Sequence, residues 1–465
     1  MRGCSTPAEL TSGERAALRL YGAAMTLLRP LLRAKLRRRG RAEPGYLHAV
    51  EERFGHYDGA PSGGWLWVHA VSLGETRAAA LWVRVLQQRR PDLRILWTHG
   101  TATGRAEGQR HLRPQDAQAW LPWDDPVSVR RFLAHWQPRL GVLMETEVWP
   151  ALVQGCRAAG VPLWLVNARL NAVSLRRAQR LRLLAGPAYR GLGGVLAQTE
   201  DDAARLRALG APVRAVTGNV KFDLPWQPEP WAAARRWRDA WRAFTGRPVL
   251  ALASSREGEE AAWLAAWRRA APAWPQPRPL WLIVPRHPQR FDEVHARLAQ
   301  AGLRVLRRSR LGPWEGEARW PAEAAQADVL LGDSVGEMAG YYALADLALI
   351  GGSFAPLGGQ NLIEAAACAC PVVLGPHTFN FAEAAQAALE EGAARRAEDF
   401  DAALHVARGW LADPAALQAA REAARTLLRR HGGASARTVA AVLDAWDAIA
   451  APAGVSAPAA APQSA

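Results

Sequence analysis

The sequence has few cysteines and no long apolar run, and each shortage excludes a class of protein. Its four cysteines form no CxxC pair and have no histidines at zinc-ligand spacing. We therefore expect neither a disulfide scaffold nor a zinc module, and a reducing cytosolic setting fits. Because no stretch of about 18 uncharged apolar residues occurs, a conventional membrane-spanning helix is not expected. A secretory signal is not expected either.

Several catalytic signatures are also missing. The chain contains neither GxxxxGK[ST] nor GxGxxG, which removes support for a P-loop ATPase or a hydride-transfer enzyme. No Ser–His–Asp set stands out, so a hydrolase is not favoured. We expect no metal site built on a DxD triplet, and instead a leaving phosphate neutralised by basic side chains and a helix terminus. No cofactor is predicted.

The composition is that of a globular protein with an excess of positive charge. Hydrophobic residues make up 49% and charged residues 22%, which excludes a mainly disordered chain. The net charge of +15 favours acidic partners such as nucleotides, anionic lipids or nucleic acid. No helix-turn-helix, RRM or KH signature occurs and the basic residues are spread widely after residue 41, so no nucleic-acid partner is expected.

The N-terminal segment, residues 1–43, predicts an amphipathic helix at a membrane surface. Residues 14–36 are largely apolar with arginines at intervals, and seven basic residues with no acid lie between Arg29 and Arg41. Such a helix suits the headgroup layer of an anionic bilayer. A solvated helix that packs on the protein is the alternative.

Two series of short apolar runs alternate with helical patterns, which predicts parallel α/β sheets. The first series lies at 65–71, 94–98, 140–144, 162–167 and 194–199, and the second at 249–254, 280–285, 328–332, 346–352 and 371–375. Three prolines in 222–231 indicate a linker between them. We predict a first domain over 44–224, a second over 225–450 and a disordered tail over 451–465. A cleft between the two domains is the expected active site.

In the first half, carboxylates follow two expected strand ends, and a lone lysine lies further along the chain. HAVSLGE (69–75) places Glu75 where a strand ends and a helix begins. This carboxylate could act as a general base or simply favour the helix dipole. METEVWP (144–150) brings Glu145 and Glu147 to a similar place, with Arg169 as a candidate counter-charge. GNVKFD (218–223) carries Lys221, one of only two lysines, which could hold an anionic group or survive by chance.

In the second half, the motifs favour phosphate binding. VPRHP (284–288) ends a strand with Pro285 and Arg286, and an arginine there could clamp a phosphate. The strongest signal is the glycine-rich stretch 350–367, in which a helix is expected to begin near Asn361. Glycines let the backbone approach a ligand closely, and the helix start offers N–H groups to a phosphate. Glu364 could accept hydrogen bonds from ribose hydroxyls, although the loop could also be purely structural.

Taken in order, the motifs resemble those of the 3-deoxy-D-manno-octulosonic acid (Kdo) transferases of lipopolysaccharide assembly. The resemblance spans about residues 44–430, and the segment before it is similar to the family's membrane anchor. The matching motifs are ERFG (52–55), HAVSLGE, LPWDDP (121–126), METEVWP, VNARL (166–170), QTEDD (198–202), GNVKFD, ASSREGEE (253–260), VPRHP, GDSVGEM (332–338), GGQNLIEAA (358–366) and GPHTFNF (375–381).

The resemblance implies a GT-B fold, with two Rossmann-like domains facing a cleft. It implies CMP-Kdo as donor, the lipid A precursor lipid IVA as acceptor, and a peripheral or shallowly anchored place on the cytoplasmic face of the bacterial inner membrane. Glu75 would be the base, and Glu145 and Lys221 would stabilise the transition state. The implied CMP contacts are Pro285, Arg286, Val335, Gly336, Glu337, Asn361, Leu362, Ile363 and Glu364.

The chain departs from the family pattern at a few positions. Ser255-Arg256 stands where Thr-His is common, and Gln360 stands where His is common. These changes concern donor contacts. Alternatives to the implied activity are another GT-B enzyme that uses a UDP-sugar, a UDP-sugar epimerase, or an inactive nucleotide-sugar-binding membrane scaffold.

Overall fold

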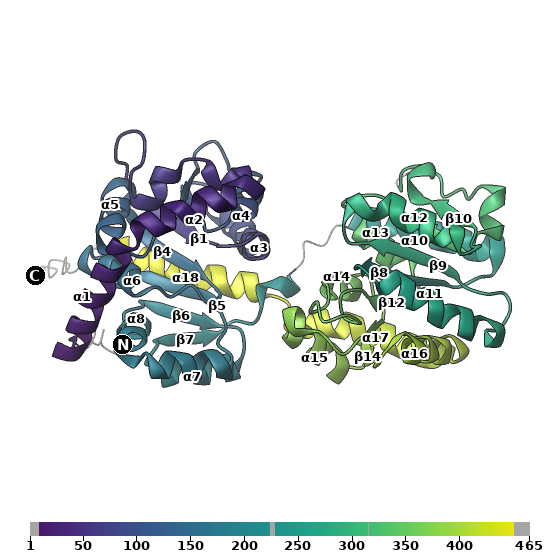
Figure 1. Ribbon diagram of the computed structural model, residues 1–465. Helices are drawn as coiled ribbons and strands as arrows, with labels where there is room; N and C mark the ends of the chain where they lie inside the picture. The colour runs from purple at the N-terminus through teal and green to yellow at the C-terminus, as the bar shows by residue number, and fades with distance from the viewer. Residues whose placement is uncertain (1–8, 224–227, 315, 451–465) are drawn as a thin grey trace, which may run out of the picture. The chain divides into compact units, whose positions relative to one another are not determined.

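The chain forms two compact α/β units (Figure 1). The computed structural model describes residues 9–223, 228–314 and 316–450. Unit 1 comprises Met1–Asp223 and Gly432–Ala465, and unit 2 comprises Leu224–His431. The expected tail, 451–465, and part of the expected linker, 224–227, lie outside the described residues.

Unit 1 is built on a seven-stranded parallel sheet with the order β3-β2-β1-β4-β5-β6-β7. Its strands are β1 Trp65–His69, β2 Ile95–His99, β3 Ala117–Trp120, β4 Pro138–Met144, β5 Leu163–Ala168, β6 Gly194–Ala197 and β7 Val213–Val216. Its helices are α1 Ser12–Leu27, α2 Arg29–Ala42, α3 Leu73–Arg89, α4 Ala102–Gln109, α5 Pro126–Trp136, α6 Pro150–Ala158, α7 Ala172–Arg180, α8 Arg182–Arg190, α9 Glu200–Ala208 and α18 Ala434–Ala450.

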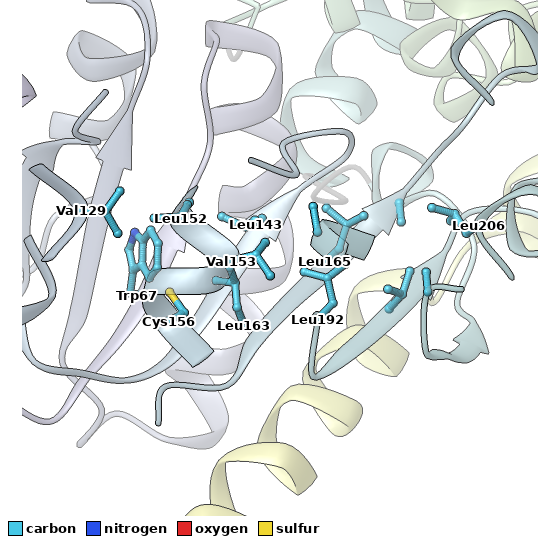
Figure 2. Close-up of a cluster of buried hydrophobic side chains, with 14 of the residues drawn as sticks. Trp67, Val129, Leu143, Leu152, Val153, Cys156, Leu163, Leu165, Leu192 and Leu206 are labelled. Carbon is cyan, nitrogen blue, oxygen red and sulfur yellow. The ribbon is translucent and has the colours of Figure 1, made fainter. Parts of the chain in front are cut away.

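Side chains that alternate along the central strands build a core on each face of this sheet. On one face Trp67, Leu143 and Leu165 pack against residues of α5, α6 and α9, such as Val129 and Leu206 (Figure 2). On the other face the neighbouring strand residues pack against α3 and α18. Burial on both faces explains why these strands were recognisable as continuous apolar runs.

Helix α18 belongs to unit 1, which corrects the predicted second-domain range of 225–450. Val439, Val442 and Trp446 of α18 join the core formed by α3 and the central strands. The chain therefore returns to the first unit at Gly432 after completing the second. The sequence pattern showed a helix with an apolar face but not which sheet that face covers.

Unit 2 repeats the architecture, with the strand order β10-β11-β9-β8-β12-β13-β14 and parallel pairing throughout. Its strands are β8 Val249–Ser255, β9 Leu280–Pro285, β10 Val305–Arg307, β11 Val329–Leu331, β12 Leu347–Ile350, β13 Val372–Leu374 and β14 Ala394–Arg396. Its helices are α10 Pro228–Thr245, α11 Glu259–Ala270, α12 Phe291–Gln300, α13 Met338–Leu344, α14 Ile363–Ala367, α15 Ala382–Glu390, α16 Phe400–Ala412 and α17 Pro414–His431.

The N-terminal segment forms two helices, α1 and α2, that are anchored to unit 1 by polar contacts. The hydroxyl of Tyr21 donates to Asp124 at 2.9 Å, and Arg29 pairs with Asp125 at 2.6 Å. Leu20, Leu27 and Leu31 are exposed. Among the described residues, no helix combines the length and the apolar character needed to cross a bilayer.

Candidate functional site

Glu75 lies in the first turn of α3, directly after β1, as the sequence predicted. Ser72 caps the helix by accepting from the backbone N–H of Glu75 at 3.4 Å. In return the Glu75 carboxylate accepts from the backbone N–H of Val71 at 3.0 Å and from the Ser72 hydroxyl at 3.2 Å. This reciprocal capping fixes the carboxylate at the carboxyl end of the sheet.

Glu145 follows β4 and is held by two cations. Its side chain is buried, and its carboxylate pairs with Lys221 at 2.7 Å and with Arg169 at 2.8 Å. The expected counter-charge from Arg169 is therefore confirmed. The backbone of Glu145 has φ of 55°, in the left-handed region that non-glycine residues rarely adopt. The local backbone is thus held in a costly conformation that aims this carboxylate at both cations.

A buried amide network positions Lys221. The carbonyl oxygen of the Asn167 side chain accepts from the backbone N–H of Val220 at 3.1 Å. Gln198 donates to the backbone carbonyl of Asn167 at 2.9 Å and accepts from Asn219 at 3.2 Å. Asn219 in turn accepts from the backbone N–H of Lys221 at 3.0 Å. Sequence reasoning did not assign a role to Asn167 or Gln198, although asparagine is scarce in this chain.

Three carboxylates near these strand ends influence one another. Burial, together with the charges of Glu145 and Glu147, raises the pKa of Glu75 to about 7, although the hydrogen bonds from Val71 and Ser72 lower it. The pKa of Glu147 is also raised, first by burial and then by Glu145, although Trp149 donates to it at 2.8 Å. A carboxylate with a pKa near neutral pH exchanges protons readily, as a general base must.

In unit 2, the glycine-rich loop after β12 is fastened by Glu259, a residue that sequence reasoning missed. Its buried carboxylate accepts from the backbone N–H of Gly352 at 2.7 Å, of Phe354 at 3.2 Å and of Arg256 at 2.9 Å. A side chain at Gly351 would overlap the backbone of Ser254. The loop therefore passes close to the end of β8 and requires glycine there.

The predicted nucleotide contacts surround this loop. Arg286 is exposed after β9, and its guanidinium donates to the side-chain oxygen of Gln360 at 3.2 Å. Asn361 donates to Glu364 at 3.0 Å. The side chains of Pro285, Leu362 and Ile363 are buried, so these residues can offer only backbone groups to a ligand. Helix α14 begins at Ile363, slightly later than expected.

The loop between β11 and α13 supplies the remaining predicted contacts. Val335 is 76% exposed and Gly336 has φ of 86°. Glu337 is held by Arg308 at 3.1 Å and by the hydroxyl of Ser334. Its carboxylate is thus fixed, while the backbone around Gly336 stays accessible to a ligand.

One acidic triplet of the kind that can hold a metal lies at the start of α16. The chain contains a DxD sequence at Asp399–Asp401. Asp399 caps α16 by accepting from the backbone N–H of Ala402 at 2.8 Å, and Asp401 pairs with Arg269 at 2.5 Å. These contacts give both acids a structural role. That the reaction needs no metal stays a prediction.

The structure brings together Glu145, Lys221 and Arg169, and places Glu75 within electrostatic reach of Glu145. The predicted nucleotide contacts gather separately in unit 2. The chemical roles of both groups, and the cleft expected between the units, stay predictions.

Comparison with known proteins identifies the family. A family model described as 3-deoxy-D-manno-octulosonic-acid transferase (kdotransferase) matches residues 48–224. A 3-deoxy-D-manno-octulosonic acid transferase of Bordetella pertussis is 50% identical over 439 residues, covering 91% of this chain and 98% of the relative. The Haemophilus influenzae enzyme of that name is 34% identical, with coverage of 78% and 83%.

A solved structure supports the architecture. The crystal structure of a glycosyltransferase from Rickettsia africae aligns with a TM-score of 0.52 at 11% identity, covering 84% of this chain and 100% of the other. This likeness concerns the fold, two Rossmann-like units of the GT-B type. From the relatives' identity and coverage, the chain belongs to the 3-deoxy-D-manno-octulosonic acid (Kdo) transferases, a family of glycosyltransferases.

Proposed function

We propose that the enzyme transfers Kdo from CMP-Kdo to a hydroxyl of lipid IVA, the lipid A precursor, with inversion at the anomeric carbon. Family membership supports the transferred sugar. The observation that carries the proposal is the arrangement in unit 1, where Glu75 has a pKa of about 7 and lies within electrostatic reach of a carboxylate bound by two cations. A single displacement activated by one base inverts the anomeric centre.

Glu75 acts as the base in this proposal. Its carboxylate takes the proton from the acceptor hydroxyl while that oxygen attacks the anomeric carbon. A pKa near neutral pH leaves a substantial fraction of the carboxylate ionised and still basic enough to accept the proton. Capping by Val71 and Ser72 fixes its orientation before the substrate binds.

Glu145, Lys221 and Arg169 provide charge stabilisation. Glu145 offsets the positive charge that develops on the Kdo ring as CMP leaves. Lys221 and Arg169 each use one donor on Glu145 and retain further N–H groups, because an ammonium has three donors and a guanidinium five. Their remaining donors suit the carboxylate of Kdo.

Unit 2 binds the nucleotide. Arg286 and the backbone N–H groups around Gly336 and Asn361 hold the CMP phosphate, and Glu364 accepts from the ribose. Arginine and backbone dipoles neutralise the leaving phosphate, so the proposal includes no metal.

The exposed leucines and the basic residues of α1 and α2 suit an anionic membrane surface. We place the enzyme on the cytoplasmic face of the bacterial inner membrane, where a lipid acceptor is accessible.

The test is Kdo transfer by Glu75→Gln. The purified variant is incubated with lipid IVA and a CMP-Kdo generating system, and products are identified by mass. We expect a rate loss of about 10²–10⁴ with CMP binding retained in calorimetry. Glu422→Gln, on an exposed part of α17, is the matched control and should retain full activity.

Two further measurements test whether the reaction needs a metal and which nucleotide the enzyme binds. Transfer should persist in EDTA, and CMP rather than UDP should raise the melting temperature. Near-normal turnover by Glu75→Gln would remove the base from the mechanism. Stabilisation by UDP-sugars alone would favour a different donor.

A further inference from the structure

An apolar groove of about 640 Å³ lies in unit 1, and none of the charged site residues described above lines it. It is lined by three helices that contact one another, α1, α5 and α6 (Figure 1). Its apolar walls include Leu18 of α1, Pro126 and Leu133 of α5, and Ala151, Gly155 and Ala158 of α6. Its volume falls within the range of small-molecule sites, about 300–1,000 Å³.

The groove is open because the residues of α6 that line it are small. Ala151 and Ala158 fill little space, and Gly155 lets α6 approach α5 closely, since a Cβ there would lie 2.5 Å from Val129. Helix α1 is held over this face by polar contacts at either side of the groove. Tyr21 donates to Asp124 at 2.9 Å, and Arg190 pairs with Glu14 at 2.6 Å. The opening is therefore a fixed feature of the packing.

Three arginines, Arg15, Arg19 and Arg130, also line the groove and are exposed. Within the described part of the chain none of them pairs with a carboxylate, and Arg15 donates only to the Ser12 hydroxyl at 3.4 Å. Neighbouring arginines of α2 behave differently, since Arg29 and Arg33 are both paired with acids. Uncompensated guanidinium groups beside an apolar groove complement a ligand with a hydrocarbon chain and a phosphate.

The groove also starts near the charged site. Pro126 and Ala151 lie at the first turns of α5 and α6, and α6 follows Glu145 after a short loop. From Ala151 to Ala158 the helix advances about 10 Å at about 1.5 Å per residue. A chain lying along α6 would thus extend away from the strand ends at which Glu75 and Glu145 are placed.

We propose that this groove binds one acyl chain of the acceptor lipid, with a phosphate of the same lipid on its arginines. The proposal rests on the proposed function for the identity of the acceptor as an anionic acylated sugar. The groove would draw one chain out of the bilayer and thereby fix the lipid relative to the base.

The test compares Ala158→Trp with Ala208→Trp. Ala158 is exposed at the groove, so an indole there fills it without entering the core, whereas Ala208 is exposed on α9 outside the groove. Binding of dodecyl phosphate, used below its micelle concentration, is measured by calorimetry. We expect Ala158→Trp and Arg19→Ala to weaken binding by about 10-fold or more, and Ala208→Trp to leave it unchanged.

Kinetics then identify the source of the chain. Ala158→Trp should raise KM for lipid IVA by about 10-fold with kcat nearly unchanged, and should not affect transfer to a fully deacylated acceptor. If dodecyl phosphate fails to bind the wild type, or binds all variants equally, the groove is not an acyl site. If Ala158→Trp instead weakens binding of the protein to vesicles that contain no acceptor lipid, the groove holds bulk membrane lipid and the proposal fails.

Two other occupants give distinct results. Binding that is seen only after residues 1–8 are deleted would assign the groove to the chain's own N-terminus. A dimer disrupted by Ala158→Trp would assign it to a second copy. Either result overturns the proposal. Failure of the wild type to transfer Kdo, with binding intact, would instead remove the proposed function and leave an anionic-lipid site.

Discussion

Glu75 should impose a pH dependence on the reaction that its neighbours control. Because the base must be ionised, kcat/KM should rise with pH and level off above the pKa of about 7. Glu147 is one of the charges that raise this pKa, so Glu147→Gln should move the rising limb to lower pH. The measurement is kcat/KM from about pH 5 to about pH 9 for both proteins. A midpoint that does not move would show that Glu147 does not act on the base.

Arg169 should act as a positioning residue through Glu145. Arg169→Ala leaves the buried carboxylate with Lys221 alone, which should allow it to turn. We expect kcat to fall about 10-fold, equivalent to about 1.4 kcal/mol, with little change in KM for CMP-Kdo. Arg169→Lys should restore part of the rate. Arg207→Ala, an exposed arginine of α9, is the control; an equal loss in that variant would point to a general effect of charge.

For single residues, the positions of the charged side chains could be predicted from the sequence better than their ion pairs. The positions of Glu75 and Glu145 could be predicted because an apolar run followed by a helical pattern marks the carboxyl end of a strand. The residues just after that run must then lie at that edge of the sheet. The pairing of Glu145 with Arg169 could also be predicted, since β4 and β5 are consecutive parallel strands. The pairing of Lys221 with Glu145 could not be predicted, because it depends on an amide network among side chains of β5 and of the loops that follow β6 and β7.

Among the secondary-structure elements, α18 should be essential to the stability of unit 1. Trp446 is 5% exposed and lies in the core that α18 forms with α3 and the central strands. The guanidinium of Arg139 lies over its ring at 4.5 Å. Trp446→Ala should reduce the free energy of unfolding of unit 1 by about 3–5 kcal/mol. Hydrogen exchange should show faster opening of β1 and α3, with unit 2 unaffected.

The matched control is Asp447→Ala, on the same helix but largely exposed. Its ion pair with Arg90 is long, at 3.4 Å, and both partners face solvent, so little change in stability is expected. If both variants destabilised unit 1 equally, the helix would matter through its charge and not through its packing.

Prediction of the elements from sequence succeeded where both faces of a strand are buried. The ten apolar runs all correspond to strands. Four edge or near-edge strands, β3, β7, β10 and β14, were missed because they are short and mix polar with apolar residues. Similarly, α10 begins at Pro228, inside the range expected to be a linker. Its three prolines suggested a break, yet proline is also well suited to the first turn of a helix.

For the molecule as a whole, the two units should be separable although the chain of the first is interrupted. Asp223, the last residue before unit 2, accepts from the backbone N–H of Gly433 at 2.5 Å and from that of Ser435. The chain therefore leaves and re-enters unit 1 at adjacent points. A protein in which residues 1–223 are joined by a short glycine–serine link to residues 432–450 should fold cooperatively, whereas residues 1–223 alone should not.

The reason is the core that α18 completes. Without Val439, Val442 and Trp446, one face of the unit 1 sheet would expose apolar residues of β1 and β4 to water. Residues 224–431 should fold by themselves and bind CMP, because every predicted nucleotide contact lies within that range. Circular dichroism and calorimetry with CMP check both statements. A folded 1–223 fragment would show that α18 is dispensable, and a unit 2 fragment that is folded but does not bind CMP would place part of the nucleotide site in unit 1.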